Sequence, residues 1–120
     1  MRRSTWILAA ALGAACSAPA PASLNAEISC KPEAERLRAR CTVALTERGT
    51  GRRVDGAAVT LHADMPSMPL SHHVPPVEAR PVGDGLYQGS LELEMAGRWV
   101  ISARVTKPVN DQFTRVVDVD

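Results

Sequence analysis

The 120-residue chain predicts an all-β domain built as an antiparallel β-sandwich. After the first 25 residues, apolar and polar residues alternate in short stretches, which is the two-residue period of strands with one buried face. Turn-forming Gly, Pro and Asp residues separate these stretches, and none of them keeps a helical period. About seven short strands with turns between them are typical of an immunoglobulin-like sandwich, which we expect over residues 26–120.

The first two strands are expected at residues 26–30 and 37–46. In the second, apolar residues alternate with polar ones, so we expect one buried face formed by Leu37, Ala39, Cys41, Val43 and Leu45. The intervening Arg36, Arg38 and Arg40 are expected to face solvent or, alternatively, to meet lipid headgroups. Glycine-rich turns then lead to a third strand at residues 59–63.

The remaining strands are expected at residues 77–82, 86–94, 98–106 and 113–119. The Gly83-Asp84-Gly85 sequence predicts the hairpin turn between two of them. Residues 98–106 show the clearest alternation, which predicts an inward face and an outward face (inward Trp99, Ile101, Ala103 and Val105; outward Ser102, Arg104 and Thr106).

Residues 1–15 have the pattern of a secretory signal peptide, with a basic start followed by an uncharged apolar run. The run is too short to cross a bilayer, which needs about 20 apolar residues. Cleavage could follow small residues at 18–20 or 21–23. Alternatively, residues 12–16 resemble a bacterial lipobox, with Gly13 at an unusual position and Cys16 as the lipidated residue. Residues 16–25 then form an Ala/Pro/Ser-rich tether, and we expect the domain on the periplasmic side of a bacterial membrane.

The chain has three cysteines, and lipidation of Cys16 would leave Cys30 and Cys41 as a pair. In an oxidising compartment, we expect these two to form a structural disulfide that closes a hairpin or a strand-to-strand corner. A redox role would favour the closer C-x-x-C spacing, and no further soft metal ligands stand nearby in the sequence.

The charge balance and the motifs argue against nucleic-acid binding and against catalysis. The net charge is +1, and loss of Arg2 and Arg3 with the signal peptide leaves the rest near neutral. We find no phosphate-binding glycine loop and no H-E-x-x-H metal motif. Ser71 and His72 are sequence neighbours, whose side chains seldom point at one another, so they do not form a nucleophile–base pair. We expect no enzyme activity.

Residues 64–76, called the Met/His loop below, combine soft donors with four prolines. Thioether and imidazole groups suit copper, above all Cu(I), and proline restricts the backbone that carries them. The candidate ligands are Met65, Met68, His72 and His73, with Met95 approaching from a neighbouring turn. Alternatively, the methionines cap the open end of a small core and the loop binds a protein partner.

Residues 57–105 resemble the YtkA-like domain, which is related to the periplasmic part of FixH-like proteins. The resemblance rests on residues 63–68, on His72 or His73, on residues 85–89, and on the spacing of Met95, Gly97 and Trp99. It implies an exported β-sandwich and, by association, copper handling beside metal-trafficking or oxidase-assembly proteins of the envelope. We therefore expect a lipid-anchored domain that binds or hands over copper(I) through the Met/His loop. The alternative is a metal-independent protein–protein interaction module that uses the same loop.

Overall fold

The computed structural model describes residues 23–33, 37–67 and 74–120, and its described part is all-β, as predicted. Cys16, Met68, His72 and His73 lie outside these residues, as do the predicted signal peptide and most of the tether. The described ranges contain no helical segment with the length and hydropathy of a membrane span. The strands are β1 (Leu24–Glu33), β2 (Arg38–Glu47), β3 (Ala58–Asp64), β4 (Val77–Gly83), β5 (Leu86–Glu92), β6 (Gly97–Lys107) and β7 (Asp111–Val119).

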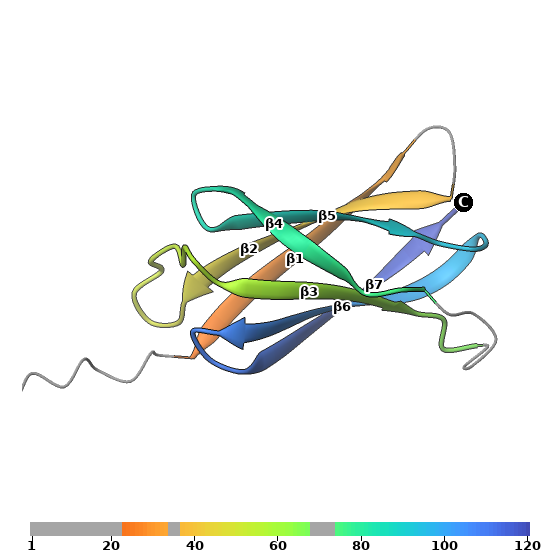
Figure 1. Ribbon diagram of the computed structural model, residues 1–120. Helices are drawn as coiled ribbons and strands as arrows, with labels where there is room; N and C mark the ends of the chain where they lie inside the picture. The colour runs from red at the N-terminus through yellow and green to blue at the C-terminus, as the bar shows by residue number, and fades with distance from the viewer. Residues whose placement is uncertain (1–22, 34–36, 68–73) are drawn as a thin grey trace, which may run out of the picture.

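The strands form one curled antiparallel sheet with the order β1-β2-β5-β4-β3-β6-β7 (Figure 1). Strand β4 joins the two halves of the sandwich, because its residues 77–79 pair with β3 and its later residues pair with β5. Strands β1 and β7 are the two edges of the sheet. Across the gap between them, Arg115 Nη1 donates a hydrogen bond to the Ile28 carbonyl oxygen at 2.7 Å.

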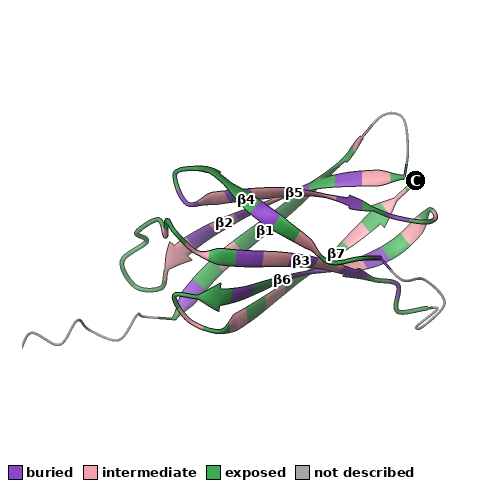
Figure 2. Ribbon diagram, in the orientation of Figure 1, coloured by how far each residue is buried: buried purple, intermediate pink, exposed green. Residues whose placement is uncertain are grey.

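The core lies between the inward faces of the two halves. Buried and more exposed residues alternate along most of the strands, as Figure 2 shows, because successive strand side chains point to opposite faces. Trp99 and Tyr87 are the largest fully buried side chains, and Trp99 is 0% exposed, as expected of a core anchor. The rest of the core is aliphatic, which leaves a small domain with little apolar area to stabilise it.

Two predicted side-chain positions are wrong. Leu37 was expected to face inward but is 37% exposed, because β2 begins one residue later and Leu37 lies beyond the paired strands. Ser102 was expected to face solvent but is only 6% exposed. It lies on β6, which is paired on both sides, directly between His62 of β3 and Thr114 of β7, so larger neighbours cover this small side chain.

The register assigns the chain segments to the two ends of the sandwich. Leu24 starts β1 opposite Glu47, whereas β1 ends opposite Arg38, which in turn pairs with Glu92 at the end of β5. The turn after β5 leads to β6, and Val100 near the start of β6 is paired with Asp64 at the end of β3. The Met/His loop therefore leaves the sandwich at the end opposite Leu24 (Figure 1).

Candidate functional site

Met65 lies at the root of the Met/His loop, directly after β3, and only 5% of it is exposed. Its methyl carbon packs against Gly97, where an added Cβ would come within 3.0 Å of Met65 Cε. Gly97 also has a φ of +141°, a backbone conformation that L residues rarely adopt. Glycine at this position thus serves both the turn into β6 and the close approach of Met65.

Met95 lies in the turn between β5 and β6, half-buried and packed against the core. Its carbonyl oxygen accepts a hydrogen bond from Trp99 Nε1 at 3.0 Å, which ties the turn to the core anchor. Because Gly97 follows Met95 by two residues and contacts Met65, this turn lies beside the root of the Met/His loop. The structure therefore places two of the five candidate ligands at one end of the sandwich, while Met68, His72 and His73 lie outside the described residues.

His62 lies apart from these methionines. It is on the outer face of β3, whereas Met65 faces the core, and it lines a polar hollow of about 190 Å³ with four residues of the same sheet face (Asp64, Ser102, Arg104 and Gln112). Among the described residues, no group of three His, Cys, Asp or Glu side chains is arranged to hold a metal ion. At the root of the Met/His loop, the candidate soft donors in the described part of the chain are thus the thioethers of Met65 and Met95.

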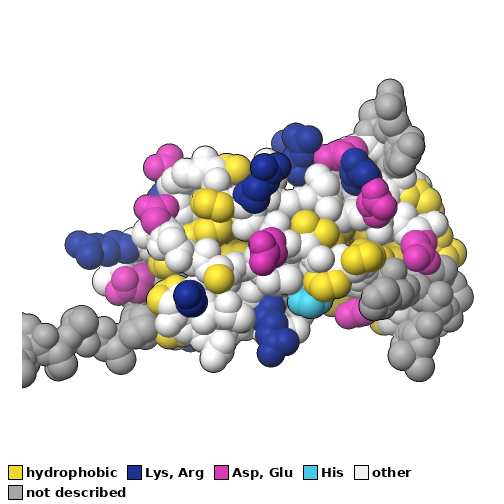
Figure 3. All heavy atoms as spheres, viewed as in Figure 1, with side chains coloured by type: hydrophobic (Ala, Val, Ile, Leu, Met, Phe, Trp, Pro, Cys, Tyr) yellow, Lys and Arg dark blue, Asp and Glu magenta, His cyan; other side chains and the backbone are white. Residues whose placement is uncertain are grey.

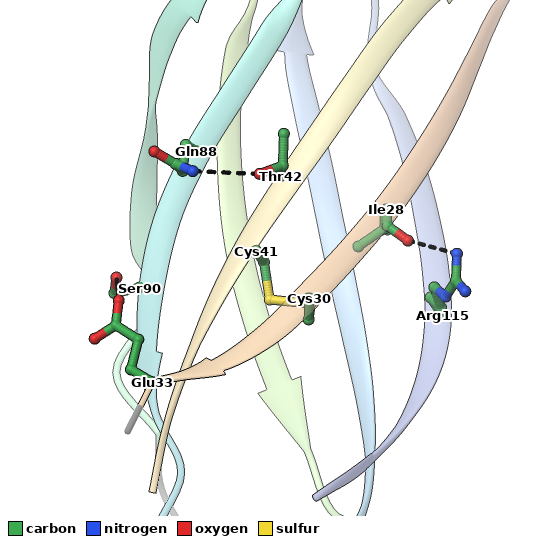
Figure 4. Close-up of a disulfide and its surroundings, with 8 residues drawn as sticks. All are labelled: Ile28, Cys30, Glu33, Cys41, Thr42, Gln88, Ser90 and Arg115. Carbon is green, nitrogen blue, oxygen red and sulfur yellow. Dashed lines mark hydrogen bonds between the residues drawn. A yellow bond between two sulfur atoms is a disulfide. The ribbon is translucent and has the colours of Figure 1, made fainter. Parts of the chain in front are cut away.

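The predicted disulfide is confirmed: Cys30 of β1 and Cys41 of β2 are bonded (Figure 4). The two residues are directly opposite in the register of the β1–β2 pair, with Cα atoms 4.1 Å apart. Cys41 is fully buried and Cys30 half-buried, so the bond belongs to the core side of these strands. The disulfide therefore has a structural role: it links β1 to β2 near the end of the sandwich from which the Met/His loop leaves.

A polar network at the same end was not found from the sequence. Glu33 Oε1 accepts hydrogen bonds from Arg40 Nε and from Ser90 Oγ, each at 3.1 Å, and Figure 4 shows Glu33 next to Ser90. Beside it, Arg38 pairs with Glu92, and this hydrogen bond raises the pKa of the Arg38 guanidinium. The sequence holds no signal for these contacts, because they depend on which strands become neighbours in the sheet.

One comparison with known proteins yields a match. A family model described as YtkA-like matches residues 20–104, which include β1 to β5 and most of β6. No curated protein and no solved structure matches the chain. The matched range includes the disulfide, the whole Met/His loop and the Met95 turn.

Proposed function

Because the chain belongs to the YtkA-like family, we propose that it is an exported, lipid-anchored, non-catalytic domain that binds or hands over copper(I) through the Met/His loop. The observation that carries the proposal is the contact of Met65 with Gly97, because it brings the Met95 turn to the root of the loop. Copper(I) prefers soft donors, and these two thioethers come from separate segments of the chain.

The surroundings of the two methionines suit a soft, low-charge site. Met65 is buried among apolar residues, and Met95 is half-buried against the same core, so both thioethers belong to a largely apolar environment. In the proposal, Met68 and one of the two adjacent histidines complete the ligand set from the outer part of the loop. His72 and His73 point in opposite directions where a segment is extended, so one of them is assigned as a ligand.

The burial of Met65 favours a second candidate function. At 5% exposed, its side chain also acts as a plug that fixes the loop to the core, and methionine is suited to filling irregular gaps. In that case the loop is a proline-stiffened docking surface for an envelope protein, and binding needs no metal. The two candidates differ in whether the thioethers are ligands or only packing groups.

The deciding experiment is a Cu(I) titration against a competing chelator. We expect one-to-one binding that falls at least about tenfold in a Met65→Leu/Met68→Leu variant, because leucine keeps the volume but lacks the sulfur donor. His62→Ala is the matched control and should leave the affinity unchanged, since His62 lies on the outer sheet face. If the unsubstituted protein does not compete for Cu(I), the copper proposal fails and the interaction module remains.

The lipid anchor has its own test. Mass spectrometry of the protein purified from the envelope should find Cys16 as the acylated first residue, and Cys16→Ser should move the protein to the soluble fraction. Cleavage after residue 20 or 23 without acylation would contradict the anchor while leaving the copper proposal untouched.

A further inference from the structure

The outer face of the β2-β5-β4 region contains a polar hollow of about 320 Å³. The register places Arg40 opposite Ser90, and Arg80 opposite Gln88, so these side chains share one face of the sheet. All four line the hollow, together with Glu78. Figure 3 shows basic and acidic side chains interspersed over the side of the molecule where β4 and β5 lie.

Arg40 is held in place by an acid outside the hollow. Glu33 Oε1 accepts from Arg40 Nε, and the same oxygen accepts from Ser90 Oγ. This contact occupies one of the five N–H groups of the guanidinium and leaves those on the two terminal nitrogens for another acceptor. The Arg40 side chain is 57% exposed, so these donors are open to a ligand.

Arg80 faces the hollow from β4 without such an acid. Within residues 23–33, 37–67 and 74–120, its guanidinium has no hydrogen-bond or ion-pair partner. Its neighbour Gln88 donates from Nε2 to Thr42 Oγ1 at 3.4 Å, a long hydrogen bond that is weaker than one near 2.9 Å. Among the residues that line the hollow, Glu78 is the one acid beside two arginines, while Glu33 contacts Arg40 and Ser90 from outside.

We propose that this hollow is an oxyanion-binding site, in which Arg40 and Arg80 hold a phosphate or carboxylate group from two sides. The planar guanidinium matches both groups with paired N–H donors, and such charge-assisted hydrogen bonds are stronger than neutral ones. The Gln88 amide supplies a further donor between the two arginines. A free anion and the acidic side chain of a protein partner present the same chemistry to this site, which is independent of copper binding.

The test is a titration of the ¹H–¹⁵N spectrum of the protein, expressed from its full-length sequence, at fixed pH and ionic strength. One series uses sodium phosphate, and a second uses a short peptide with blocked ends and a single Glu. We expect saturable shifts centred on the amides of Arg40, Arg80, Gln88 and Ser90. Arg80→Gln should weaken binding about tenfold through loss of a charge-assisted contact, and Glu78→Gln should strengthen it by removing the opposing charge.

Arg104→Gln is the matched control, because Arg104 is an exposed strand arginine on the outer face of β6, in the other half of the sandwich. Saturation by phosphate alone supports the site and identifies a small anion, whereas tighter binding of the peptide supports it and identifies an acidic partner. Shifts that do not saturate with either probe overturn the proposal. An equal loss in Arg80→Gln and Arg104→Gln overturns it as well, since only overall charge would then matter.

Discussion

At the scale of single residues, Tyr87 shows how one polar atom organises a loop over the core. Its hydroxyl donates to the Val54 carbonyl oxygen at 2.7 Å and accepts from the Ala57 amide at 2.9 Å. Its ring is buried, so the two hydrogen bonds connect the segment before β3 to the interior. The same segment is also attached by an isolated bridge at Arg53, by the Val54 amide, which donates to the Leu45 carbonyl oxygen at 3.0 Å, and by the Asp55 carboxylate, which accepts from the Gly85 amide at 2.9 Å.

Tyr87→Phe should lower the free energy of unfolding by about 1–3 kcal/mol, because it leaves a partly buried amide and a carbonyl without their partner. Urea unfolding followed by tryptophan fluorescence measures this change, with an unchanged m-value as evidence that the same surface is exposed. A loss below about 0.5 kcal/mol would mean that water replaces the hydroxyl at no cost.

Gly97 is the second residue on which a local structure depends. Gly97→Ala should destabilise the protein by about 1–3 kcal/mol, through its positive φ and the approach of the new methyl group to Met65 Cε. In a Met65→Ala background the cost should be smaller, because one of the two causes has gone. Equal costs in both backgrounds, measured by urea unfolding, would assign the whole effect to the backbone conformation.

At the scale of strands, alternation of apolar and polar residues, together with the turn residues between the stretches, locates all seven. The strand expected at residues 98–106 is Gly97–Lys107, and the one expected at 26–30 extends to Leu24–Glu33. Strand β1 continues beyond residue 30 because its last residues pair with β2 without being buried. Pairing of polar residues leaves no apolar pattern in the sequence, so this extension could not be predicted. The split pairing of β4 could not be predicted, since it depends on the positions of both neighbouring strands.

The candidate site was predictable only in part, for the same reason. The soft donors could be read from residues 64–76, and the turn carrying Met95 was expected at the same end. The contact between Met65 and Gly97 joins residues 32 positions apart, and the network of Glu33, Arg40 and Ser90 joins three strands. Such contacts follow from the sheet order, which a single sequence does not reveal.

The disulfide between β1 and β2 should be a large part of the stability of this small domain. Replacing both Cys30 and Cys41 with serine should cost about 2–3 kcal/mol, because the bond constrains the unfolded chain between two residues with a sequence separation of 11. Urea unfolding of the double variant measures the loss, and reduction of the unsubstituted protein with dithiothreitol should reproduce it. An unchanged free energy of unfolding in both cases would show that the pairing of β1 with β2 holds these strands together without the disulfide.

At the scale of the whole molecule, the sheet is continuous except between its edges, β1 and β7. Strand β4 connects the two halves on one side through pairing with both β3 and β5. On the other side, the described residues show no strand pairing between β1 and β7, and the Arg115 side chain reaches the Ile28 carbonyl instead. An inward-pointing charge on an edge strand also discourages pairing with another chain.

Arg115→Ala should therefore increase the amide hydrogen-exchange rates of β1 and β7 while leaving those of β2, β3, β5 and β6 nearly unchanged, because only the edges lose a contact. Arg104→Ala serves as the control, since Arg104 lies on the outer face of β6. A uniform increase across all strands would instead indicate that Arg115 supports the global stability of the domain.

The opposite positions of Leu24 and the root of the Met/His loop would set the distance of the loop from the bilayer if Cys16 carries a lipid anchor. A strand of ten residues spans about 33 Å, at about 3.3 Å per residue. With lipid on Cys16, the sandwich would stand with Leu24 toward the bilayer and carry the loop on its distal tip. Under the copper proposal, a metal donor or acceptor would then have to be a diffusible carrier or rise about that far from the membrane surface, and shortening or lengthening the tether would change this reach.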